Sequence, residues 1–176
     1  MRLPADATLI VIESEDPWNG TQDTGAPEAN VAALVAAWRA ERLPRVRVRR
    51  SRFDLVAPGA GPAPDGEIVL DNAANSAFSD ARLEVTLDDI GATTLVFCGL
   101  PESAVAATAR EACALGYQVF VPADAIGHDG KDARDGQAFA RLARDGANIV
   151  DTLTTLGAAA MAKARQRWRE ERSREV

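Results

Sequence analysis

The chain has 176 residues, which is enough for one domain with a buried core of its own. Apolar residues make up 47% of it and charged residues 26%, the usual balance of a soluble globular protein. The net charge of −6 argues against nucleic acids and anionic membranes as partners, and no apolar run approaches the ~20 residues of a membrane helix. The first residues carry no signal-peptide pattern, so we expect a cytoplasmic protein.

Strand-like and helix-like segments alternate along the chain. Short apolar runs predict strands at residues 8–12, around Val46, and at 67–70, 94–98, 118–122 and 148–150. Apolar residues at helical spacing predict helices over residues 29–42, 103–115 and 137–144. A left-handed helix cap that favours glycine is predicted between helix and strand at Gly91, Gly116 and Gly146. This alternation predicts an α/β fold with a parallel sheet covered by helices on both faces.

Two segments depart from this alternation. Residues 54–66 are rich in proline and glycine and predict a surface loop. Residues 157–176 begin with alanines and end with mixed charges, which predicts a solvated C-terminal helix. We therefore divide the chain into a domain over residues 1–156 and a helical extension over residues 157–176. Ligands are expected at the carboxyl ends of the strands, where doubly wound sheets bind them.

Four segments, in this order, resemble the isochorismatase-like hydrolases, a cysteine hydrolase superfamily. They are "TLIVIE", "NVAALVAAWRAERLPRVRVRRSR", "NSAFSDARLEVTLDDIGATTLVFCGL" and "TAREACALGYQVFVPADA", and the resemblance extends from residue 8 to about residue 156. It implies a Rossmann-like three-layer sandwich with a six-stranded parallel sheet flanked by helices. It also implies a catalytic triad in which a cysteine at a helix N-terminus attacks, an aspartate moves its proton and a lysine balances the charge.

The same resemblance implies that all three triad positions are substituted. The aspartate position holds Glu13, the lysine position holds Asn72, and the cysteine position holds Ala104, or Val105 if the one-residue gap in the preceding turn lies later. In the family this turn contains a cis peptide that helps to form an oxyanion hole. The shortened turn and Pro101 argue against an intact hole here.

Neighbouring residues offer two other sources of chemistry. Glu102 and Ser103 stand at the head of the predicted helix, where both residue types are favourable. We favour this plain helix start over a serine nucleophile, because a serine needs a base nearby and the only histidine, His128, follows the strand predicted at 118–122. Glu13 ends a buried strand and is a candidate general acid, although the acidic run that follows it also fits a solvated turn.

Arginines alternate with valines around the second predicted strand. A strand buried on both faces should not carry this pattern, so one face is exposed, paired with acidic groups, or part of a subunit contact. Arg49 and Arg50 lie at the carboxyl end and are candidates to bind a carboxylate or phosphate. Ion pairing within this acidic protein is the interpretation that we favour.

The remaining chemical groups are few. The two cysteines, Cys98 and Cys113, lack metal-ligand spacing and fit isolated buried thiols. The stretch "RRSRFDL" contains no histidine where zinc-binding relatives carry theirs, so we expect no metal, and we expect no cofactor. Trp38 is expected in the core or at an interface. The candidates to line a pocket are Trp18, Phe78, Pro101, Glu102, Ser103, Arg49 and Arg50.

These observations favour a pseudoenzyme: a small-molecule-binding or assembly protein on a hydrolase fold, without the triad. We expect a homo-oligomer and a small-molecule ligand, with anionic compounds among the candidates. One alternative is a Cys-independent hydrolase that cleaves a vinyl ether or amide (C–O or C–N bond) with Glu13 as general acid. Another is a partner subunit for an active relative, a role that the alanine-rich C-terminal helix would suit.

Overall fold

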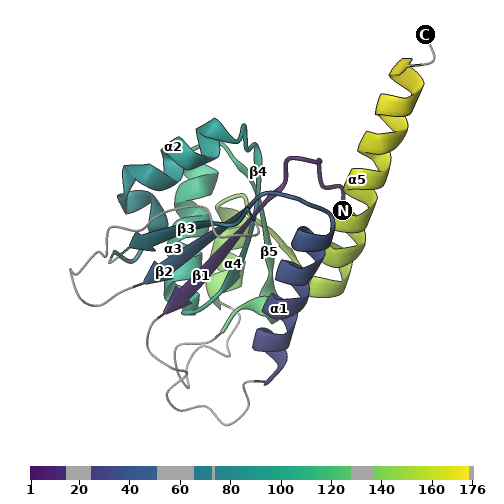
Figure 1. Cartoon of the computed structure of the whole chain (residues 1–176). Helices are drawn as coiled ribbons and strands as arrows, with labels where there is room; N and C mark the ends of the chain where they lie inside the picture. Colours follow the sequence, from purple (N-terminus) through teal and green to yellow (C-terminus); the bar gives the residue numbers. More distant parts are fainter. Residues whose placement is uncertain (15–24, 51–65, 73, 128–136, 175–176) are drawn as a thin grey trace.

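The computed structural model describes residues 1–14, 25–50, 66–72, 74–127 and 137–174 (Figure 1). Within these residues the strands are β1 (Thr8–Ser14), β2 (Arg45–Arg50), β3 (Ile68–Asn72), β4 (Thr94–Gly99), β5 (Gln118–Pro122) and β6 (Asn148–Val150). The helices are α1 (Gly25–Ala40), α2 (Ala81–Asp89), α3 (Glu102–Ala114), α4 (Gln137–Arg144) and α5 (Thr152–Arg174), with short 3-10 turns η1 (Ala77–Ser79) and η2 (Ala123–Ala125).

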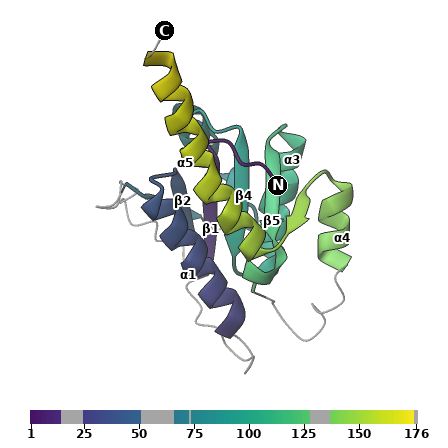
Figure 2. The same cartoon turned by 90° about the vertical axis from the view of Figure 1, so that its right-hand side faces the viewer.

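The six strands form one parallel sheet in the order β3-β2-β1-β4-β5-β6. Helices α1 and α5 cover one face of the sheet, and α2, α3 and α4 cover the other (Figures 1 and 2). This confirms the predicted three-layer α/β sandwich. The strand order reverses between β1 and β4, which is where sheets of this kind hold their ligands.

The side chains of β1 alternate between the two halves of the core. Ile10 and Ile12 pack on the side of α2, α3 and α4, whereas Leu9 and Val11 pack on the side of α1 and α5. Trp38 of α1 is fully buried on the second side, and its Nε1–H donates to the carbonyl oxygen of Ala7 at 2.9 Å. Trp38 is therefore a core residue, one of the two roles predicted for it.

Three helices end at glycines with the left-handed backbone conformation that the sequence predicted. Gly91, Gly116 and Gly146 have φ values of 64°, 91° and 105°, the left-handed region in which a side chain is disfavoured. Each follows a helix and precedes a strand. These three predicted helix caps are confirmed.

Helix α5 begins at Thr152, five residues before the predicted extension, and it runs through the predicted boundary at residues 156 and 157 without a break. Its start is fixed by Asp151, whose carboxylate accepts a hydrogen bond from the Thr154 N–H at 2.7 Å. Its inner face packs on α1 and on the sheet, while its carboxyl-terminal turns extend beyond the body (Figures 1 and 2). Among the described residues, no helix is both long enough and apolar enough to cross a membrane.

Candidate functional site

The carboxyl ends of the parallel strands bring most of the predicted site residues to one edge of the sheet. In the strand register, Glu13 of β1 lies beside Arg49 of β2, and Arg50 lies between Ser14 of β1 and Asn72 of β3. The head of α3 follows β4, the other neighbour of β1. Trp18 and His128 lie outside the described residues, as does most of the predicted loop at 54–66.

The turn between β4 and α3 is fastened to the strands on both sides. The Leu100 N–H donates to the Ile12 carbonyl at 2.8 Å, and the Glu102 N–H donates to the Gly127 carbonyl at 2.9 Å. The turn contains a cis peptide between Leu100 and Pro101. The N–H groups of Ala104 and Val105 both donate to the Pro101 carbonyl at 3.1 Å. Four backbone donors of this turn are thus engaged within the protein, which leaves them unavailable to stabilise an oxyanion.

The head of α3 is apolar where the resemblance places a nucleophile. Ala104 and Val105 are buried, with exposures of 0% and 1%, and they pack into the core on the side of α2, α3 and α4. Glu102 and Ser103 lie in the first turn, as the helix-start interpretation predicted. The N-cap residue is Pro101, which makes no side-chain cap hydrogen bond.

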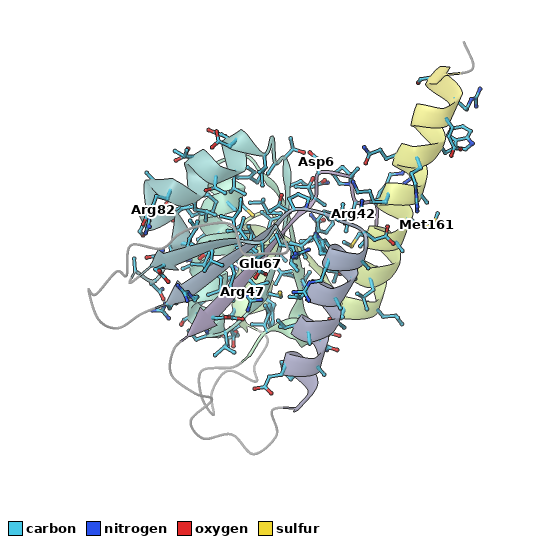
Figure 3. All side chains as sticks on the ribbon, in the orientation of Figure 1. Asp6, Arg42, Arg47, Glu67, Arg82 and Met161 are labelled. Atoms are coloured by element: carbon cyan, nitrogen blue, oxygen red, sulfur yellow. The ribbon has the colours of Figure 1, made fainter. Side chains whose placement is uncertain are left out.

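Glu13 lies on the other face of the sheet. Because side chains alternate along β1, Glu13 shares the side of Val11, and its carboxylate accepts a hydrogen bond from Nη1 of Arg47. Arg47 also donates to Glu67 at 3.0 and 3.2 Å (Figure 3). Glu13 and Ala104 therefore come from neighbouring strand ends, yet their side chains belong to opposite faces.

The arginines of β2 separate into two groups. Arg45, Arg47 and Arg49 share one face, and each has an acidic neighbour: Arg45 lies 4.0 Å from Glu67, and Arg49 donates to both oxygens of Asp71 at 2.8 and 3.1 Å. This is the ion pairing that the sequence favoured.

Arg50 differs from these three. The alternation of β2 places it on the face of Val48, the side of α2, α3 and α4, and its buried Nε has no hydrogen-bond partner among the residues that the structure describes.

Asn72 and Phe78 have structural contacts. The Asn72 side chain donates to the Ser76 carbonyl at 2.8 Å and accepts from the Ala74 N–H at 2.7 Å, so it shapes the turn after β3. Phe78 has an exposure of 8% and packs against Tyr117, with ring centroids 6.1 Å apart. Phe78 is thus a core residue next to this edge of the sheet.

Neither thiol lies at the head of α3. Cys98 is fully buried in β4, and burial, with a smaller contribution from Glu13, raises its pKa to about 12. Cys113 lies near the end of α3, and burial together with Asp145 raises its pKa. A raised pKa disfavours the thiolate that cysteine chemistry requires. In the part of the chain that the structure describes, no three or more histidines, cysteines or carboxylates gather as a metal site would require.

Known proteins resemble this chain at two levels. A family model of the isochorismatase domain matches residues 18–154. Streptothricin hydrolase from Streptomyces noursei is 45% identical over 60 residues, which make up 34% of this chain and 22% of that hydrolase. The match thus spans less than a quarter of that hydrolase's length.

Solved structures share the fold. An isochorismatase-family protein from Burkholderia thailandensis is 25% identical with a TM-score of 0.71, covering 90% of this chain and 98% of its own. An isochorismatase from Pseudomonas putida is 24% identical with a TM-score of 0.71, and the match covers 88% of this chain and 92% of that one. YcaC from Escherichia coli, an octameric hydrolase of unknown specificity, is 19% identical with a TM-score of 0.69, covering 90% and 80%. The family model matches residues 18–154, which is most of this chain, and solved structures of the family share its fold. This chain therefore belongs to the isochorismatase family.

Proposed function

We propose that this chain binds a small anionic compound at the carboxyl edge of its sheet and does not use a cysteine nucleophile. The observation that carries the proposal is the buried pair Ala104 and Val105 at the head of α3. The resemblance assigns the nucleophile to one of these two positions, and neither an alanine nor a valine side chain can attack a carbonyl carbon. The turn that leads into the helix remains hydrogen-bonded to β1, from the Leu100 N–H to the Ile12 carbonyl, without the reactive group.

Arg50 supports an anionic ligand. A buried guanidinium N–H without a partner is unfavourable, and a carboxylate or phosphate would satisfy it with a charge-assisted hydrogen bond. Ser14 and Asn72 flank Arg50 in the strand register and border the same edge. Acid catalysis by Glu13 ranks second, because a general acid must donate a hydrogen bond to the substrate, whereas the Glu13 side chain is held as a hydrogen-bond acceptor for Arg47.

Replacing Arg50 by glutamine should weaken anion binding roughly 10- to 100-fold, the usual effect of losing one charge-assisted hydrogen bond. The wild type would be titrated calorimetrically with cyclic and aromatic carboxylates and with inorganic phosphate. Arg49→Gln is the matched control, since Arg49 is the preceding residue of β2 but pairs with Asp71 on the opposite face of the sheet. Equal weakening by both variants would argue for a general charge effect, and no binding by the wild type would refute the anion site.

Alkylation with iodoacetamide should leave anion binding unchanged. Cys98 is inaccessible and has a pKa of about 12, and the half-buried Cys113 has a raised pKa at the far end of α3 from the carboxyl edge. Binding before and after treatment would be compared, with mass spectrometry to count the modified thiols. Rapid loss of binding that the anion protects against would place a thiol in the site and contradict the proposal.

A further inference from the structure

A cavity of about 670 Å³ lies at the amino ends of the strands, at the edge of the sheet opposite to the anion site. On the side of the sheet it is lined by residues at or shortly before the starts of β1, β4 and β5, namely Asp6, Thr93, Thr94 and Gln118 (Figure 3 labels Asp6). The first residues of the chain and one face of α5 form its other walls. Small-molecule sites have volumes of roughly 300–1,000 Å³, so this cavity is large enough to hold a ligand.

The N-terminal segment is fixed against α5. Leu3 and Ala162 are buried in the same half of the core, and Nη2 of Arg165 donates to the Leu3 carbonyl at 3.3 Å. A turn follows, in which the Ala7 N–H donates to the Pro4 carbonyl at 3.3 Å. Because contacts within the chain hold these walls, a ligand would enter a cavity that is already formed and would not have to order it.

The lining of the cavity carries charges of both signs. Arg165 and Gln166 follow Ala162 by three and four residues, so the three lie on one face of α5. Arg2 adds a second guanidinium group from the N-terminal segment, and Asp6 adds a carboxylate. A ligand with only a carboxylate would meet the like charge of Asp6, and a ligand with only an amine would meet two arginines. A compound that carries both groups fits the lining best.

The charged groups retain hydrogen-bonding capacity for such a compound. Arg165 has five N–H donors, and its printed contact with the Leu3 carbonyl uses one of them. The Asp6 carboxylate accepts a hydrogen bond from the Thr93 hydroxyl at 3.1 Å, through Oδ2. A carboxylate can accept about four hydrogen bonds, so Asp6 can also receive an ammonium group.

We propose that this cavity is a second binding site, which takes a small zwitterion of about dipeptide size. The carboxylate of the ligand binds the guanidinium groups of Arg2 and Arg165, and its ammonium group binds Asp6. The ligand would join the N-terminal segment, α5 and the amino ends of the strands. This site does not rest on the proposed function, because Arg50 lies at the carboxyl end of β2, at the other edge of the sheet.

The charge requirement can be tested with three related probes. They are L-alanyl-L-alanine, its N-acetylated form, which lacks the ammonium group, and its amide, which lacks the carboxylate. In calorimetric titrations the wild-type chain should bind the free dipeptide roughly tenfold or more tightly than either derivative. Equal affinity for the free and the N-acetylated dipeptide would overturn the zwitterion, and no saturable binding of the free dipeptide would overturn the site.

Substitutions assign each charge of the probe to a residue. Asp6→Asn should weaken binding of the free dipeptide roughly tenfold and leave binding of the N-acetylated form unchanged. Arg165→Gln should weaken binding of the free dipeptide by a similar factor and leave binding of the amide unchanged, whereas Arg165→Lys keeps the charge and should restore most of the affinity. Arg172→Gln is the matched control, because it removes the same charge from α5 at a residue that packs on Trp168. Wild-type affinity in both Asp6→Asn and Arg165→Gln would overturn the assignment.

Hydrogen exchange measured by mass spectrometry locates the probe. Saturation with the free dipeptide should slow amide exchange in residues 2–6 and 162–166, which line the cavity, and leave exchange around Arg50 unchanged. Protection confined to the residues around Arg50 would place the dipeptide at the carboxyl edge. That result would overturn this inference and leave the anion site standing.

Discussion

Gly99→Ala is expected to destabilise the fold by roughly 3–5 kcal/mol, combining a sparsely populated backbone conformation with overpacking. Gly99 ends β4 with a φ of 112°, and a Cβ there would lie 2.0 Å from the carbonyl oxygen of Ile12. The obstacle is backbone in the central strand of the sheet, so it cannot rotate away. The same carbonyl accepts the hydrogen bond from Leu100, so moving it would also loosen the turn into α3.

The matched control is Gly91→Ala. Gly91 also has a positive φ, 64°, but an added Cβ would meet no atom within 4 Å, so only the backbone cost of about 1–2 kcal/mol applies. Urea denaturation of both variants would give the two free energies of unfolding. If both variants lost the same free energy of unfolding, the end of β1 would have to shift and relieve the contact between the added Cβ and the Ile12 carbonyl. That result would contradict the expected overpacking.

Glu67→Gln should lower the free energy of unfolding by about 3 kcal/mol, because it removes negative charge from beside a buried arginine. The side chains of Arg45 and Glu67 are only 3% and 7% exposed, and Arg47 donates two hydrogen bonds to the same carboxylate. Glutamine has nearly the same shape as glutamate, so the packing is preserved. The loss of stability therefore measures the effect of removing the charge.

Asp71→Asn provides the comparison on the same pair of strands. Arg49, the partner of Asp71, is 47% exposed, so this pair should contribute less than about 1 kcal/mol, and salt should screen it. Urea denaturation at low and high ionic strength would separate the two cases. A loss for Glu67→Gln as small as that for Asp71→Asn would mean that water reaches the buried cluster.

The sequence predicted the fold because its main features are local. Apolar runs and helical periodicity mark most strands and helices to within two residues, and the three glycine caps lie where helices end. The start of α1 was predicted four residues late, at residue 29 instead of Gly25. Pro27 is tolerated there because the first turn of a helix needs no N–H from it.

The site was less predictable because its contacts depend on which strands become neighbours. Glu67 was predicted only as the first residue of a strand, and its role follows from the pairing of β2 with β3. The partner of Glu13 likewise requires β2 beside β1, and neither neighbour can be deduced from local spacing. The alternating arginines were the available signal: they indicated acidic partners without identifying them.

The strand order also constrains how the sheet can be completed during synthesis. β1 lies between β2 and β4, but β2 is made soon after it, at Arg45–Arg50, whereas β4 is made only at Thr94–Gly99. Until then the nascent chain can assemble at most β1, β2 and β3, and the side of β1 that later pairs with β4 stays unpaired. This central strand therefore spends much of translation as an edge strand with unpaired backbone groups, which is the kind of strand that pairs with other chains.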